Sequence, residues 1–319
     1  MFRAEKAEVK IQGIIPLQNG FDVTDYTMMK LDLSFAHCVP LMLPAHNHVE
    51  FIVVGTGGTG GFLIPSVARL MLEIEANSNK TASCIVVDPD IIEPKNIPRQ
   101  NFQQSEIGLH KAEVLAARYS LGLGVQIRAI AKPFTKKIIS ARWRKLTVVI
   151  GCVDNAAARA EISSCLEQNY SDSPPQIWWL DCGNHAVSSS GQVVFGSTNQ
   201  FTLKGAFDHL EKPNFCFNLP SPSRQHPELL TPLPEELNST TLSCAEIQAR
   251  NRQSLFVNQQ VAVIAAEYLL ALTLTGGLRK FATYFHNTTG SCRSLYICVN
   301  SLQKFTNEEI ISQKRSVSV

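Results

Sequence analysis

The sequence predicts an α/β fold, a doubly wound and mostly parallel sheet with an antiparallel C-terminal extension. Three observations indicate it. Buried-looking apolar runs alternate with helical patterns between residues 49 and 196, one of these runs stops at the glycine-rich loop GTGGTG (55–60), and the last part of the chain alternates around a turn. Strands that alternate with helices form a parallel sheet covered on both faces, whose ligands bind at the carboxyl ends of the strands.

The first βαβ unit surrounds the glycine-rich loop. VEFIVVG (49–55) is a predicted buried strand, and ASCIVVD (82–88) is the next one. Between them, 62–77 has helical spacing, with one apolar face made by Leu63, Val67, Leu70 and Ile74. Pro65 is expected in the first turn of this helix, where a missing N–H does little harm.

The alternation then continues. The predicted elements are a helix near 106–120, strands at 125–130 and 145–154, a helix at 155–168, and strands at 176–182 and 191–196. Segment 212–240 holds six of the sixteen prolines, which predicts a crossing loop or flap. A long helix at 244–274 and a terminal hairpin follow. We expect a lead-in at 1–48, a nucleotide-binding core at 49–200, and 201–319 as the crossover loop, long helix and hairpin of the same domain.

Composition excludes several classes of function. The 319 residues carry a formal charge of +2, which gives no reason to expect nucleic acid as a partner. The chain has no uninterrupted apolar run of about 18 residues, which is the length needed to span a membrane, so no membrane span is predicted. The charged start MFRAEKAEVK does not resemble a signal peptide, so a cytoplasmic protein is expected. The nine cysteines form no CxxC pair, so no structural zinc is predicted.

The glycine-rich loop is a candidate phosphate site. Its glycines, Gly55, Gly57, Gly58 and Gly60, allow a tight turn, and the following helix presents its N-terminal N–H groups to an anion. The motif alone does not separate NAD from ATP. Asp88 ends the next strand, where a carboxylate accepts hydrogen bonds from ribose hydroxyls. Asp90 is grouped with it, and the alternative is that Asp88 is a solvated acid.

The residues after Asp88 favour phosphoryl chemistry. Four polar side chains follow in order, namely Asn96, Arg99, Gln100 and Lys111. Hydride transfer has no use for an arginine and a lysine beside the glycine loop, whereas cations neutralise the charge that develops on a triphosphate. The alternative for Lys111 is an ordinary surface lysine. Asp154 ends a later strand and is a candidate Mg²⁺ ligand, unless it caps the following helix, which carries Arg159 one turn in.

These motifs resemble a known family. GTGGTG, DPDIIEPKNIPRQ, Lys111 and CVDN stand in the order and spacing of the ThiF/MoeB/HesA proteins, the E1-like enzymes that activate ubiquitin-like proteins. LDCGNHAVSSSGQVVFG and LSCAEIQARNRQSLFVNQQVA look like the ThiF branch of PRTRC systems. There, an E1-like protein is encoded beside ubiquitin-like, E2-like and JAB-peptidase-like proteins.

The resemblance implies a Rossmann-like adenylation domain that uses ATP and Mg²⁺. Phosphates would lie on Gly55–Gly60, the ribose on Asp88 and Mg²⁺ on Asp154, with Arg159 in a supporting role. The phosphate contacts would be Asn96, Arg99, Gln100 and Lys111. The C-terminal carboxylate of a small β-grasp protein would attack the α-phosphate. The resemblance also implies a homodimer and suggests an E2-like partner.

A later thioester step is left open. Cys244, at the predicted start of the long helix, is favoured as the nucleophile over Cys182, and both have an alternative as packing thiols. Two other functions stay open beside adenylation. One is an NAD-dependent oxidoreductase, and the other is a non-catalytic scaffold that binds nucleotide or partner.

Overall fold

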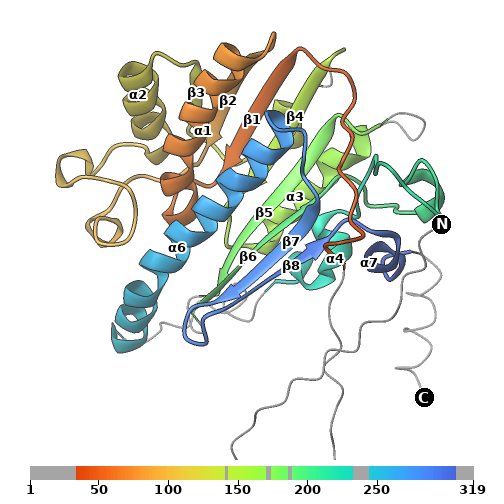
Figure 1. Ribbon diagram of the computed structural model, residues 1–319. Helices are drawn as coiled ribbons and strands as arrows, with labels where there is room; N and C mark the ends of the chain where they lie inside the picture. Colours follow the sequence, from red (N-terminus) through yellow and green to blue (C-terminus); the bar gives the residue numbers. More distant parts are fainter. Residues whose placement is uncertain (1–33, 141–142, 170–173, 186–188, 233–243, 307–319) are drawn as a thin grey trace, which may run out of the picture. The chain divides into compact units, whose positions relative to one another are not determined.

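A computed structural model describes residues 34–140, 143–169, 174–185, 189–232 and 244–306, with the backbone alone at 185 and 244–255. The described residues from Ser34 onward belong to one compact unit. Its centre is an eight-stranded sheet in the order β3-β2-β1-β4-β5-β6-β7-β8 (Figure 1). Most of the predicted lead-in at 1–48 lies outside the described residues, and the division at residues 48 and 200 stays a prediction.

The first five strands are parallel, as predicted. They are β1 (His48–Val54), β2 (Thr81–Val87), β3 (Ile127–Ile130), β4 (Lys145–Gly151) and β5 (Ile177–His185). β1 lies between β2 and β4 and is buried on both faces. Phe51 and Val53 pack into the cluster that includes α1 and α6 residues, whereas Ile52 and Val54 pack into the cluster that includes α3 residues. This two-sided burial is the reason that the strand is a continuous apolar run.

Helix α1 (Gly58–Asn77) begins within the glycine-rich loop, with Gly57 as its N-cap. Pro65 is therefore inside the helix, and the prediction that it lies in the first turn is wrong. A proline has no N–H to donate to the carbonyl four residues earlier, which here belongs to Gly61. Asn101 supplies a bond instead, with its Nδ2 2.9 Å from Gly61 O. The carbonyl of Gly61 that Pro65 leaves free thus accepts a hydrogen bond from Asn101, which joins the segment after β2 to α1.

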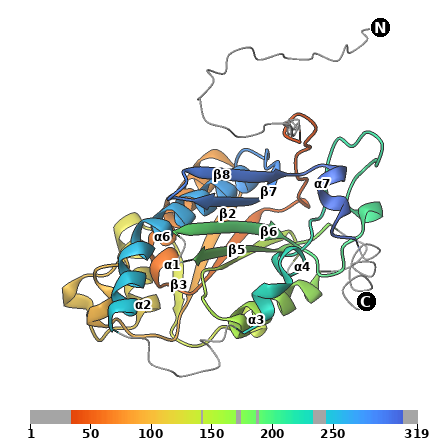
Figure 2. The ribbon, with the colours of Figure 1, turned by 90° about the horizontal axis from the view of Figure 1, so that it is seen from below.

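Helices cover both faces of the sheet, and Figure 2 shows the sheet between them. α1, α2 (Lys111–Leu123) and α6 (Cys244–Thr273) cover one face, and α3 (Ala156–Cys165) and α4 (Pro222–Gln225) cover the other. Short 3-10 turns lie at Pro94–Asn96, Gln104–Glu106, Lys136–Ile138, Leu166–Gln168, Leu203–Gly205 and Pro227–Leu230. The helix expected near 106–120 begins at Lys111, because 104–106 forms one of these turns.

The C-terminal part of the sheet is antiparallel, which confirms the predicted extension. It consists of β6 (Ser190–Gly196), β7 (Lys280–His286) and β8 (Ser291–Tyr296), and β7 and β8 form the expected terminal hairpin. A short helix that was not predicted, α7 (Val299–Gln303), follows the hairpin. The architecture is therefore the predicted α/β fold, with a mostly parallel sheet.

The proline-rich segment contains only the short α4 and one 3-10 turn up to residue 232, in line with its composition, and 233–243 lie outside the described residues. Helix α6 follows and runs beside α1 (Figure 1). Its part Phe256–Thr273 is long and apolar enough to cross a membrane, but half of that window is buried. Packing against α1, β5 and β6 accounts for its apolar character.

Candidate nucleotide site

The site lies at the carboxyl ends of three neighbouring strands. Because β1 lies between β2 and β4, the glycine-rich loop is flanked by the segments that follow those two strands. Gly55 N donates to Val87 O at 2.9 Å on one side, and Cys152 N donates to Val54 O at 2.8 Å on the other. Gly55 has a φ of +85°, and a Cβ there would lie 2.6 Å from Cys152 O. Only glycine allows this close approach.

The other predicted loop glycines form the start of α1. Gly57 is the N-cap and Gly58 the first helical residue, while a Cβ on Gly60 would collide with the carbonyl oxygen of Gly55. The first N–H groups of a helix have no partner within the helix, and the helix dipole adds a partial positive charge there. The loop therefore presents the N-terminus of a 20-residue helix to the site. This arrangement binds phosphates in many proteins.

Asp88 is buried and holds the loop. Its Oδ2 accepts from the backbone N of Thr56 at 2.6 Å and from Thr56 Oγ1 at 3.0 Å. Its Oδ1 accepts from the backbone N of Asp90 at 2.9 Å. The alternative of a solvated acid at a strand end is therefore wrong. The carboxylate connects the end of β2 to the glycine-rich loop, so that a ligand bound by one would be aligned with the other.

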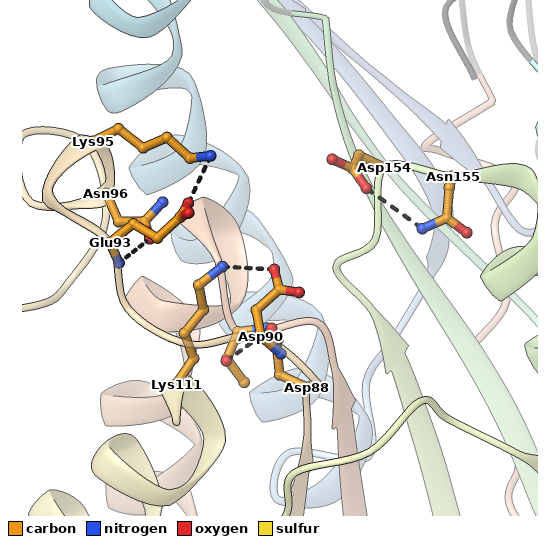
Figure 3. Close-up of polar contacts among 9 residues, drawn as sticks. Asp88, Asp90, Glu93, Lys95, Asn96, Lys111, Asp154 and Asn155 are labelled. Carbon is orange, nitrogen blue, oxygen red and sulfur yellow. Dashed lines mark hydrogen bonds and ion pairs between the residues drawn. The ribbon is translucent and has the colours of Figure 1, made fainter. Parts of the chain in front are cut away.

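Lys111 is the first residue of α2, and its side chain is buried. Its Nζ lies 2.8 Å from Oδ2 of Asp90, whose own side chain is mostly exposed (Figure 3). The alternative of an ordinary surface lysine is wrong, because this side chain is buried and its ammonium group contacts Asp90 in the segment that follows β2. The structure thus pairs Lys111 with Asp90, and the role of Lys111 as a phosphate contact stays a prediction.

The three remaining residues of this segment have different surroundings. Asn96 is buried and accepts from the backbone N of Glu93 at 2.8 Å, which stabilises the turn. Arg99 Nε and Gln100 Oε1 are enclosed and have no hydrogen-bond partner among the described residues. The amide of Gln100 lies against Gly57, with Nε2 3.5 Å from the place where a Cβ would be. Enclosed polar atoms without partners are costly, so these two atoms mark the segment as a candidate functional region.

Asp154 lies across the glycine-rich loop from these residues, after β4. It is exposed, and its carboxylate has one long contact with the described residues, 3.5 Å from Asn155 Nδ2 (Figure 3). Asn155 is the N-cap of α3, because its Oδ1 accepts from Ala158 N at 2.8 Å. The alternative that Asp154 caps this helix is therefore wrong, and its oxygens are available to a cation.

Arg159 is held by an acid that the sequence analysis missed. Its Nε lies 3.1 Å from Oδ1 of Asp181 in β5, whose side chain is fully buried. Burial raises the pKa of Asp181, and the positive charge of Arg159 partly opposes that shift. Arg159 thus joins the first turn of α3 to β5, and its supporting role in the site stays a prediction.

The two cysteines differ in what they can do. The structure makes Cys182 a poor nucleophile, because a hydrogen bond with the Cys152 thiol and burial both raise its pKa well above the ordinary value. Cys244 is the first residue of α6, as predicted, and its backbone alone is described. Its role as a thioester nucleophile stays a prediction. No group of three or more metal-ligating side chains occurs within the part of the chain that the structure describes.

Sequence reasoning also missed three polar residues around the loop. Thr56 bonds Asp88, Asn101 joins the segment after β2 to α1, and Asn258 from α6 accepts from Thr59 Oγ1 at 3.1 Å. A signal was present for Asn258, which interrupts the apolar pattern of LFVNQQVAV in the long helix. The sequence does not show which distant loop such an interruption faces.

Together, the sheet order, the glycine-rich loop at a helix N-terminus and the flanking carboxylates define an α/β protein of the Rossmann-like class, with a candidate nucleotide site at the carboxyl ends of its parallel strands. A family model described as "ThiF family" matches residues 45–291, which is most of the chain. The chain therefore belongs to the ThiF family, and the predicted family is confirmed. Its predicted closeness to the PRTRC branch stays a prediction.

Several solved structures are similar to this chain. PaaA has 10% identity and a TM-score of 0.48, and the match covers 78% of this chain and 64% of that one. E. coli MccB, in a structure titled with AMPCPP and MccA, has 15% identity and a TM-score of 0.48 over the same shares. MccB with ATP has 14% identity and a TM-score of 0.45. This chain thus spans about 64% of the length of these proteins. No curated protein matches the chain.

Proposed function

We propose that this protein uses ATP and Mg²⁺ to adenylate the C-terminal carboxylate of a small ubiquitin-like β-grasp protein. Membership of the ThiF family supports an E1-like adenylating enzyme in general terms. The observation that carries the proposal is the amide of Gln100, whose Nε2 lies 3.5 Å from a Cβ built on Gly57 at the N-terminus of α1. A phosphate on the loop would accept a hydrogen bond from this Nε2.

The reaction uses residues on both sides of the loop. A carboxylate oxygen of the partner protein attacks the α-phosphorus, the bond to the bridging oxygen of the β-phosphate breaks, and an acyl-adenylate and pyrophosphate form. Negative charge moves onto the leaving pyrophosphate in this step, so fixed cations nearby stabilise the transition state. We assign this role to Arg99 and Lys111, and the ribose to Asp88.

Asp154 is the residue that we propose to hold Mg²⁺. This cation binds through one or two carboxylates together with substrate phosphates, so a single exposed carboxylate beside a phosphate loop is a sufficient protein contribution. Bound Mg²⁺ would neutralise charge on the triphosphate. Asp154 itself would orient the cation from the β4 side of the site.

The partners and the later steps are extensions of the same proposal. The similarity to ThiF-family motifs supports a β-grasp protein as the acyl donor, a homodimer as the assembly and an E2-like protein as the acceptor. A thioester on Cys244 would follow adenylation. Cytoplasmic localisation is part of the proposal because ATP is abundant there.

Pyrophosphate exchange tests the adenylation step. Labelled pyrophosphate should enter ATP only when Mg²⁺ and a β-grasp protein ending in glycine are both present. Asp154→Ala should abolish exchange and should not change the unfolding temperature, since the side chain is exposed. Glu211→Ala, which also removes an exposed acid, is the matched control and should retain full exchange. Full exchange by Asp154→Ala would contradict the assignment of the metal ligand.

Further measurements on the purified protein distinguish adenylation from the two alternative functions, an NAD-dependent oxidoreductase and a non-catalytic scaffold. Thermal-shift measurements should show stabilisation by ATP and none by NAD, and the reverse result would favour an oxidoreductase. A protein that binds ATP but shows no exchange with any β-grasp candidate would be a scaffold. The Cys244→Ala variant should keep exchange and lose any thiol-sensitive conjugate, which tests the thioester separately.

A further inference from the structure

Helix α6 reaches the glycine-rich loop through one side chain. Asn258 is almost fully buried, with 2% of its surface exposed, and its amide lies directly over Gly58, the first residue of α1. The two atoms of this amide have different surroundings. Oδ1 accepts from Thr59 Oγ1 at 3.1 Å and from Nδ2 of Asn184 in β5. The oxygen is therefore saturated, and these two donors fix the orientation of the amide.

The nitrogen of the same amide has no such contacts. Among the described residues, Nδ2 of Asn258 has no hydrogen-bond partner. It is also the atom that a Cβ on Gly58 would meet first. A buried N–H donor thus lies beside the first turn of α1, and its direction is fixed by the bonds of Oδ1.

A second amide lies on the neighbouring residue of the loop. Gln100 Nε2 is the atom closest to a Cβ built on Gly57, at 3.5 Å, and Gln100 Oε1 is enclosed without a partner. Two side-chain amides, one from α6 and one from the segment after β2, therefore lie against Gly57 and Gly58. These are the positions where the free N–H groups of α1 begin. Several donors around one helix N-terminus suit a group with several acceptor oxygens, such as phosphate.

We propose that Asn258 is a nucleotide-binding residue, whose Nδ2 donates a hydrogen bond to a phosphate oxygen of the nucleotide on the glycine-rich loop. The inference rests on the proposed use of ATP. It assigns part of the nucleotide site to the C-terminal region of the chain. A purely structural contact between α6 and α1 would need only Oδ1, which already joins Thr59 to Asn184.

The test compares ligands with and without phosphates. Equilibrium dissociation constants for ATP and for adenosine are measured by calorimetry on the wild-type protein and on Asn258→Ala, Asn258→Asp and Gln259→Glu. Gln259 is the next residue of α6, and its side chain makes no hydrogen bond with the described residues. Gln259→Glu therefore adds the same charge as Asn258→Asp on a different side of the helix.

Loss of one hydrogen bond to a charged group should weaken ATP binding about 10- to 100-fold in Asn258→Ala. Asn258→Asp should weaken it further, because a carboxylate then faces the phosphates. Adenosine binding should change less than about threefold in both variants, and Gln259→Glu should bind ATP like the wild type. Unfolding temperatures without ligand confirm that each variant is folded.

Two results would overturn the inference. One is wild-type ATP affinity in both Asn258 variants, and the other is an equal loss for ATP and adenosine, which would make Asn258 a purely structural residue. If the aspartate variant does not fold, the ATP-to-adenosine comparison in Asn258→Ala decides alone. The proposed function fails in a different way, since the wild-type protein itself would then bind no ATP.

Discussion

Two buried lysines form ion pairs of almost equal length at opposite ends of the parallel strands. Lys145 begins β4, and its Nζ lies 2.7 Å from Glu50 Oε2, with 7% and 15% of the two side chains exposed. Lys111 lies beyond the end of β2, and its Nζ lies 2.8 Å from Asp90 Oδ2, with 8% and 63% exposed. The lysines are equally buried, and only their carboxylate partners differ.

The difference separates a structural pair from one that a ligand can rearrange. Glu50 and Lys145 are both mostly buried. If either side chain lost its partner, its charge would be left unpaired with little access to water. The Asp90 side chain is mostly exposed, so water can solvate its carboxylate if Lys111 binds another anion instead. Ion pairs with an exposed partner contribute little to stability, so breaking this one costs little. A lysine that is buried but shares an exposed partner is thus able to contact a phosphate.

Breaking the enclosed pair should have the largest effect. Lys145→Met leaves the Glu50 carboxylate buried and unpaired, which should lower the free energy of unfolding by about 3–5 kcal/mol. Urea denaturation measures this loss. Adding Glu50→Leu to the same chain should restore part of it, because no buried charge is then left. A loss below about 1 kcal/mol in the single variant would show that water reaches the unpaired Glu50 carboxylate and would contradict a buried pair.

Lys111→Met should have the next largest effect, and on activity instead of stability. Loss of a cation that stabilises the transition state should reduce pyrophosphate exchange by about 100-fold or more. Its unfolding temperature should change little, since Asp90 is solvated once it is unpaired. Lys95→Met is the control, because Lys95 pairs with Glu93 on the surface of the same segment. Equal losses of exchange in the two variants would contradict the comparison.

A third buried charge, Asp181, should make stability depend on pH. Its pKa in the folded protein is raised above the ordinary value of 3.8. The stability contribution of a group with a raised pKa is present below pH 3.8 and is lost as the pH rises through the folded-state pKa. Asp181→Asn removes this loss, so the variant should gain stability relative to the wild type as the pH rises, by at most about 1.4 kcal/mol per pH unit.

Denaturation curves of both proteins are measured between pH 4 and 8. The quantity of interest is the unfolding free energy of Asp181→Asn minus that of the wild type, which should rise with pH. Other titrating groups cancel in that difference. A difference curve that falls with pH would mean that the charge of Arg159 outweighs the burial of Asp181.

The smallest effect should come from the exposed partner of Lys111. Asp90→Asn keeps an acceptor near the lysine and should cost about 1 kcal/mol or less in unfolding free energy. Glu50→Gln at the other end of the strands should cost several times more. A double-mutant cycle at each pair measures the two coupling energies, and equal values would remove the distinction between the pairs.

Local patterns were sufficient to predict the parallel strands, because two-sided burial leaves continuous apolar runs such as that around Phe51 and Ile52. They failed at the start of α1, since glycines that form a helical turn have the composition of a loop. The predicted site residues that follow their strands, Asp88 and Asp154, could be placed because carboxyl ends of parallel strands share one edge.

Contacts over long sequence distances were not predictable. Asn258 bonds Thr59 across 199 positions of the sequence, and nothing local to either residue indicates the other. Asp181 was hidden for a related reason: its strand motif LDC contains one acid that looks like an ordinary strand-end residue. Its burial beside Arg159 follows only from the packing of α3 on β5.

The length of α6 has a consequence for the order of chemical events. The helix is continuous from Cys244 to Thr273, and Asn258 lies on the glycine-rich loop. At 1.5 Å per residue, the fourteen residues from Cys244 to Asn258 span about 21 Å along the helix axis. The backbone of Cys244 is therefore separated from the loop by about four turns of helix. If the proposed adenylation and thioester steps both occur, α6 would act as a spacer between the two reaction centres.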